Sequence, residues 1–135
     1  MDQERRFTLA EAQQLLDTEL RELAERMVEA CARSRDLESR WRKLVIAIGS
    51  NGGDMERPEV RDLQRAVEAA HAELNEIVAR FTGQGVQVKD MDRGLIDFPA
   101  KVDGQDALLC WHVGEGPIAF WHSPQDGFAG RKPLE

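Results

Sequence analysis

The sequence has few of the residues that most often carry catalysis, and it contains no long hydrophobic run. Its 135 residues include two cysteines, three histidines and no tyrosine, and only 6% are aromatic. Two distant cysteines argue against a disulfide-rich secreted domain and against a CxxC motif. No apolar stretch is long enough to span a membrane, and none follows Arg5 and Arg6 as it would in a signal peptide. We therefore expect a cytoplasmic protein.

The sequence also lacks an excess of positive charge. The net charge of −7 argues against binding to nucleic acids or to anionic membranes, because both require a basic surface. One basic stretch, residues 33–43, carries five basic and two acidic side chains, and we interpret it as the solvated flank of a helix. The length predicts a single domain over residues 1–135.

Two apolar repeats with spacings of three and four residues dominate the first 82 residues. Such a repeat keeps one stripe of a helix against a partner helix. The run Gly49-Ser50-Asn51-Gly52-Gly53 interrupts them, so the sequence predicts an antiparallel coiled-coil hairpin over residues 8–82 with a loop at 49–57. The repeats consist of Leu16, Leu20, Leu23, Met27, Ala30, Ser34, Leu37, Trp41, Leu44 and Ile48, then Val60, Leu63, Val67, Ala70, Leu74, Ile77 and Phe81.

The ends of both predicted helices carry local signals. Thr8 followed by Glu11 is typical of a capping box, and Gly49 ends the first helix. Pro58 suits the first turn of the second helix, where its missing N–H has no partner. We expect Gly83 to supply the left-handed residue that ends this helix.

Residues 86–135 change to short alternating segments separated by Gly, Pro and Asp, which predicts an antiparallel sheet of three or four strands. The strands are expected at 86–90, 95–100, 106–113 and 118–122. Asp103-Gly104 predicts a two-residue hairpin turn, which places Asp97 opposite Cys110. One face of this hairpin is then uniformly apolar: Ile96, Phe98, Ala100, Ala107, Leu109, Trp111 and Val113.

This apolar face determines the predicted architecture. Because the second helix is shorter than the first, the turns that contain Leu9, Ala12, Leu16 and Leu20 lack a helical partner. We expect the sheet to cover them. The predicted fold class is therefore α+β, with a long antiparallel two-helix hairpin and a small antiparallel sheet packed on the base of the first helix.

Two registers are open for the last strand. Matching of apolar residues places Trp111 opposite Phe120, which puts His122 on the core face and Trp121 on the other face. A one-residue bulge exchanges His122 and Trp121. The first register is our expectation.

Several motifs together resemble a prokaryotic family known as domain of unknown function 2203. They lie at residues 7–12, 92–100, 109–111, 121–122 and 127–134, so the resemblance covers the whole chain. The family often has Arg or Lys where His112 stands, and an acidic residue where Ser123 stands. The resemblance implies a cytosolic protein and supplies no activity.

The outer face of the sheet gathers the residue types that could carry chemistry. Asp97 and Cys110, with His112 two residues along, could activate a thiol nucleophile or ligate zinc, and His122 joins them in the bulged register. The structural alternative is that Cys110 fills space in the strand and that His122 is a hydrogen-bonded core residue.

The C-terminal tail offers a cation to these groups. Arg131 lies in a glycine-rich tail that contains Gly127 and Gly130, and its guanidinium suits a carboxylate. We expect an internal tie from Arg131 to Asp97 or to Asp92. The alternative is that Arg131, His122 and backbone N–H groups bind a small anionic ligand.

These observations lead to three hypotheses, none with an assigned catalytic residue. The first is a non-catalytic interaction or scaffold protein that acts through its helical hairpin. An apolar patch of Ala24, Val28 and Cys31 on the first helix favours a homodimer or another protein partner. The second is a small-anion or zinc site built from Asp97, Cys110, His112, His122 and Arg131, and the third is a Cys-dependent hydrolase.

Overall fold

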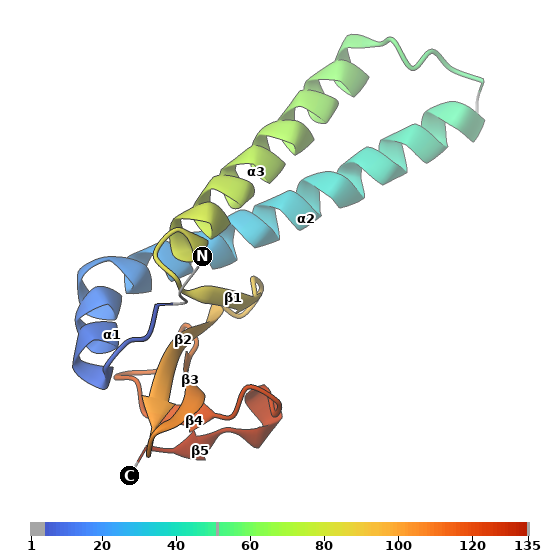
Figure 1. The fold of residues 1–135 in the computed structure, drawn as a ribbon. Helices are drawn as coiled ribbons and strands as arrows, with labels where there is room; N and C mark the ends of the chain where they lie inside the picture. The colour runs from blue at the N-terminus through green and yellow to red at the C-terminus, as the bar shows by residue number, and fades with distance from the viewer. Residues whose placement is uncertain (1–4, 51, 135) are drawn as a thin grey trace.

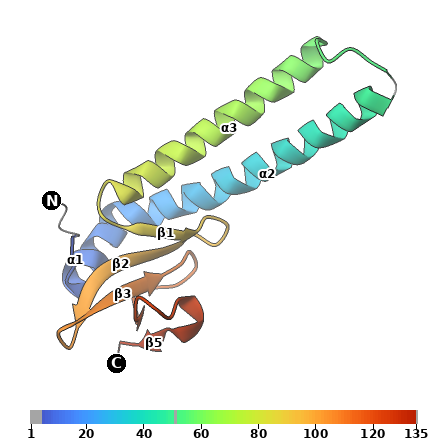
Figure 2. The same ribbon diagram turned by 45° about the vertical axis from the view of Figure 1, so that its right-hand side comes forward.

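The computed structural model describes residues 5–50 and 52–134, which form a helical hairpin and a five-stranded sheet (Figure 1). The first helical segment comprises α1 (Leu9–Leu15), the π-helical stretch η1 (Leu16–Leu20) and α2 (Arg21–Ser50). The second is α3 (Pro58–Thr82). The sheet lies at the end of the hairpin opposite its connecting loop (Figures 1 and 2). The α+β prediction is confirmed.

No helix within the described ranges is both long enough and apolar enough to cross a membrane.

The predicted helix starts are confirmed, and the predicted end of α3 is wrong in one detail. The backbone N–H of Glu11 donates to Oγ1 of Thr8 over 3.1 Å, and Glu11 Oε1 accepts from the Thr8 N–H over 2.9 Å. Pro58 occupies the first turn of α3. Gly83, however, has a helical φ of −63°. The left-handed residue is Gly85, with φ of 83°, because the turn continues for two residues past Gly83.

The π-helical stretch η1 separates α1 from α2 and was not predicted. A π-turn adds a residue to the helical repeat and so rotates the apolar stripe around the helix. Leu16 and Leu20 are both fully buried there, whereas Leu9 in α1 is 45% exposed. The expectation that Leu9 would be covered is therefore wrong. The helix also changes direction between α1 and α2 (Figure 1).

The five strands pair in the order of the sequence, and every pair is antiparallel. They are β1 (Gln87–Asp90), β2 (Leu95–Val102), β3 (Gln105–Trp111), β4 (Phe120–His122) and β5 (Lys132–Pro133). The predicted hairpin register of β2 and β3 is confirmed, with Phe98 opposite Leu109 and Asp97 opposite Cys110. The short strand β5, which pairs with β4, was not predicted.

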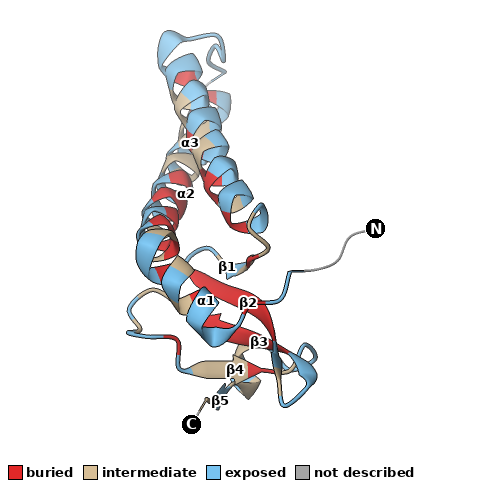
Figure 3. Cartoon of the chain, turned by 60° about the vertical axis from the view of Figure 1, so that its left-hand side comes forward, coloured by how far each residue is buried: buried red, intermediate tan, exposed pale blue. Residues whose placement is uncertain are grey.

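The inner face of the sheet covers the base of the first helix, as the sequence predicted. Leu16 and Leu20 belong to one hydrophobic cluster with Ile96, Phe98 and Trp111 of the sheet. The same cluster includes buried residues of α2 and α3. Figure 3 shows the buried residues concentrated where β2 and β3 face α1 and the lower part of the hairpin. The helices and the sheet therefore share one core.

The apolar patch of Ala24, Val28 and Cys31 is covered by the chain itself. Ala24 and Cys31 are both buried. The turn between β1 and β2 lies against Val28, because a Cβ added at Gly94 would lie 3.1 Å from Cγ2 of Val28 and would overlap Cγ2 of Val113. The patch therefore needs no second copy of the chain to bury it.

The packing of this turn can be tested with two glycine substitutions. Gly94 and Gly104 both have positive φ, but a Cβ at Gly104 would meet no atom within 4 Å. Gly104→Ala should lower the free energy of unfolding by about 1–2 kcal/mol through backbone strain alone. Gly94→Ala should cost roughly 1–3 kcal/mol more because of overpacking.

Chemical denaturation followed by circular dichroism measures both losses. Val113→Ala in the Gly94→Ala background should recover part of the additional loss. Equal losses for the two single variants would show that Gly94 does not pack closely against Val28 and Val113.

Candidate functional site

The register of β4 differs from the sequence-based expectation, and this difference creates the site. Leu108 lies opposite His122, and Leu109 lies opposite Trp121. His122 therefore shares the outer face with Cys110, while Trp121 packs against the core. The register observed is the alternative in which His122 and Trp121 exchange faces.

The physical reason lies in the connection between β3 and β4. Ile118 was expected to begin the last strand, but it is a buried residue of the loop. Its N–H donates to Oε1 of Gln13 in α1 over 2.8 Å. The indole N–H of Trp111 donates to the carbonyl of Gly116 over 2.9 Å. These contacts form a long connection in place of a tight turn, and β4 begins only at Phe120.

Three adjacent strands contribute one ligand-type side chain each to the outer face. Asp97 comes from β2, Cys110 from β3 and His122 from β4. One potential ligand atom of each residue lies within 4.8 Å of the other two. The residues are only 1%, 1% and 2% exposed. A carboxylate, a thiol and an imidazole are thus held together away from bulk water.

The hydrogen bonds of His122 define which of its nitrogens faces the cluster. Nδ1 lies 2.8 Å from the carbonyl oxygen of Ser123, and a carbonyl can only accept, so Nδ1 carries a hydrogen. Nε2 lies 3.0 Å from Oδ2 of Asp97. In the neutral imidazole, Nε2 therefore carries a lone pair that faces a carboxylate oxygen. The contact is favourable with one proton between the two atoms, and a metal ion could take the place of that proton.

The second oxygen of Asp97, Oδ1, is buried and meets no hydrogen-bond donor of good geometry in the described part of the chain. Leaving a buried acceptor unsatisfied costs about 1–3 kcal/mol. Burial raises the pKa of Asp97, and the neighbouring His122 offsets this only in part. The thiol of Cys110 also lies close enough to the carboxylate to lower the pKa of Asp97 slightly. Burial therefore makes the ionised carboxylate of Asp97 unfavourable, and a bound cation would stabilise it.

The thiol of Cys110 is not activated as a nucleophile in this environment. Burial is the largest effect, and together with the negative charge of Asp97 it raises the pKa of Cys110 to about 11. Arg131 opposes this shift, with Nη1 4.0 Å from Sγ. At neutral pH the metal-free site holds the protonated thiol, which is a poor nucleophile. This geometry gives the hydrolase hypothesis no support.

His112, which was expected beside Cys110, lies outside the cluster. Strand β3 ends at Trp111, and His112 begins the following turn. Its Nδ1 lies 2.8 Å from the carbonyl of Val113, and its ring lies 5.9 Å from the ring of Phe128. The expectation failed because the strand ends one residue before His112.

Arg131 does not form the expected tie to Asp97 or Asp92. It makes a bidentate pair with Glu115, over 3.1 and 2.7 Å, and lies against the rings of Phe120 and Phe128. Strands β3 and β4 stand between β5, beside Arg131, and β2, which carries Asp97. Asp92 instead accepts from the thiol of Cys31 over 3.1 Å and pairs with Arg35.

Glu115 was missed from the sequence because it lies in a loop whose shape the sequence left open. Burial by itself raises the pKa of Glu115, but hydrogen bonds from Arg131 and from the backbone N–H of His112 outweigh burial and hold the pKa below its ordinary value. With Arg131 occupied in this way, its guanidinium is not available to a small anion at the cluster.

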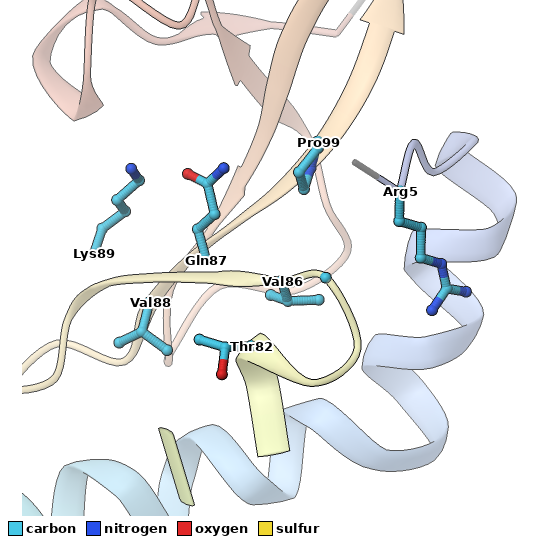
Figure 4. A pocket seen from close by; sticks show the side chains of 8 residues that line it. Arg5, Thr82, Val86, Gln87, Val88, Lys89 and Pro99 are labelled. Carbon is cyan, nitrogen blue, oxygen red and sulfur yellow. The ribbon is translucent and has the colours of Figure 1, made fainter. Parts of the chain in front are cut away.

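Lys89 is a second site residue that was missed. It lines a cavity of about 210 Å³ together with Asp97, Cys110 and His122. Lys89 is exposed and makes no hydrogen bond or ion pair with the described residues. Strand alternation could have suggested its neighbour Gln87, which lies opposite Asp97. The same alternation places Lys89 on the face of Gln87 (Figure 4), but no pairing register was predicted for this strand.

Comparison with known proteins gives a family but no function. No curated protein and no solved structure matches the chain. A family model described as an uncharacterized conserved protein, DUF2203, matches residues 5–134. This range includes every residue of the cluster and both helical segments of the hairpin. The chain therefore belongs to the uncharacterized conserved family DUF2203.

Proposed function

We propose that this protein binds a divalent transition-metal ion, with zinc as the best match, through Asp97, Cys110 and His122. The observation that carries the proposal is the buried carboxylate of Asp97, whose Oδ1 meets no donor of good geometry among the described residues and whose Oδ2 faces Nε2 of His122. This zinc site on the sheet was the second hypothesis from the sequence. Three of its five predicted residues remain in it.

The chemistry of the three side chains favours zinc over hard cations. Thiolate, imidazole and carboxylate are all zinc ligands, whereas Mg²⁺ and Ca²⁺ prefer oxygen alone. Zinc holds tetrahedral ligands roughly 3.3–3.8 Å apart when the bonds are about 2.0–2.3 Å. The three atoms already lie within 4.8 Å of one another, so small side-chain adjustments suffice.

The surroundings of the ligands also suit a metal. The hydrogen bond from Nδ1 of His122 to the carbonyl of Ser123 is the kind of outer contact that fixes the tautomer of a ligating histidine. Arg131 lies 4.0 Å from the sulfur of Cys110 and favours the thiolate that a metal requires. Three protein ligands leave a fourth position for water or a small ligand.

Titration with Co²⁺, a spectroscopic substitute for zinc, tests the proposal. Wild-type protein should bind one Co²⁺ per chain and develop thiolate-to-cobalt charge-transfer absorption. Saturation at 100 times the dissociation constant should raise the free energy of unfolding by about 2.7 kcal/mol. Cys110→Ser should abolish the thiolate band.

Cys31 provides a matched control, because it is also a buried cysteine beside an aspartate. Cys31→Ser should retain the band and the affinity of the wild type. The absence of stoichiometric Co²⁺ binding by the folded wild type would overturn the proposal. So would a thiolate band that depends on Cys31 and not on Cys110.

We propose self-association of the hairpin, with a second copy of the chain as the partner, as a second function. Its support is the distal half of the hairpin, where large apolar side chains remain partly exposed. Ile46 is the most exposed of them, at 66%. Other apolar residues of this half are only of intermediate burial, most of them in the two apolar repeats: Leu37, Trp41, Leu44, Val45, Leu63 and Val67.

The charges of the two helices favour a second copy over an unrelated partner. Residues 33–43 of α2 carry five basic and two acidic side chains, whereas α3 carries five acidic and three basic ones. In a twofold dimer, the basic stretch of each copy can face the acidic helix of the other. This arrangement would cover the distal apolar surface on both copies.

Sedimentation equilibrium tests this second candidate. Wild-type protein should be dimeric at tens of micromolar, and Ile46→Asp should weaken the dimer by about tenfold or more, since it places an unpaired charge in the contact. Met91→Asp is the matched control, because Met91 is also an exposed apolar residue, at 38%, but lies between β1 and β2. Wild-type protein that remains monomeric at tens of micromolar would exclude the dimer.

A further inference from the structure

We infer that the metal site takes a small monocarboxylate as its ligand, with the carboxylate at the open metal position and beside the ammonium of Lys89. This inference rests on the proposed metal site and adds the chemical class of its ligand. It is carried by the position of Lys89, by the charge of the site and by the shape of the adjoining cavities.

Lys89 lies on the edge strand β1 and lines three neighbouring cavities. It lines the cavity of about 210 Å³ that holds the cluster, a second of about 310 Å³ beside Arg6, and a third of about 460 Å³ beside Arg5. Figure 4 shows Lys89 and Gln87 projecting from β1 to one side, while Val88 projects to the other. Because Lys89 and the three ligand residues line the same cavity, a ligand bound there would lie near this ammonium.

The charge of this surface is opposite to that of the whole chain. The chain has a net charge of −7, yet among the described residues the only carboxylates that line the three cavities are Asp97 and Asp106. Asp106 is paired with Arg6, and Asp97 would be a metal ligand. The surface thus attracts anions.

The charge of the loaded site favours a monoanion. A carboxylate from Asp97 and a thiolate from Cys110 would together cancel the two charges of a zinc ion, and His122 would bind as the neutral imidazole. With the zinc charge cancelled, the ammonium of Lys89 gives the cavity a net charge of one positive unit. A carboxylate neutralises one charge, whereas a phosphate dianion would leave an excess negative charge close to a thiolate.

The remaining walls indicate the body of the ligand. Leu95, Leu108, Pro124 and Phe128 line the same cavity as the cluster, and they favour an apolar group. The volume of about 210 Å³ is below the usual range of about 300–1,000 Å³ for drug-sized ligands. A short aliphatic or aromatic acid fits both features.

The test uses full-length Co²⁺-loaded protein and three probes: 3-methylbutanoate, its neutral amide and inorganic phosphate. The carboxylate should change the cobalt absorption in a saturable way. The amide and phosphate should bind at least tenfold more weakly. Lys89→Met should weaken carboxylate binding by about tenfold, because a hydrogen bond to a charged group contributes on that order.

Lys101→Met is the matched control, because Lys101 is an exposed lysine of the same sheet that lines none of the three cavities. It should leave the carboxylate affinity within about twofold, and both variants should remain folded and bind one Co²⁺ per chain. Equal binding of the amide, tighter binding of phosphate, or an unchanged affinity in Lys89→Met would overturn this inference alone. Failure of the wild type to bind Co²⁺ would overturn the proposed function as well.

Discussion

Burial of the inner face of the β2–β3 hairpin against the base of the first helix is the constraint on which the rest of the structure depends. Side chains alternate between the faces of a sheet, so a register that buries Phe98 and Trp111 also fixes what lies outside. With Phe98 opposite Leu109, Asp97 must lie opposite Cys110. A slip of one residue would place Asp97 in the hydrophobic core and expose Phe98. The core and the outer cluster are therefore two consequences of one register.

Much of the fold could be predicted because its signals are local or periodic. The helical hairpin follows from apolar spacing, and the β2–β3 register follows from Asp103-Gly104 together with one apolar face. The π-turn at η1 was not predicted, since no local motif marks it; its two leucines pack in a core shared with a sheet that is distant in sequence. The same applies to β4, whose register depends on a hydrogen bond between Ile118 and Gln13 of α1.

The site shows the same division between local and distant information. Asp97 and Cys110 were predicted as neighbours because both lie in a hairpin of known turn type. His122 lies in the cluster because the longer β3–β4 connection shifts the register of β4. His112 belongs to that connection and not to strand β3, so it lies outside the cluster. Arg131 forms its ion pair with Glu115, a loop residue whose position could not be predicted from the sequence. A buried Asp–His pair with a carboxylate oxygen that lacks a well-placed donor is costly to a fold, and ligand binding gives that cost a physical explanation.

Zinc-edge X-ray absorption of wild-type protein loaded with one equivalent of Zn²⁺ tests the central claim most directly. If Asp97, Cys110 and His122 hold the ion, the metal should have one sulfur neighbour at about 2.3 Å and nitrogen or oxygen neighbours at about 2.0–2.2 Å, with total coordination near four. A shell of nitrogen and oxygen alone, or one with two or more sulfurs, would contradict it.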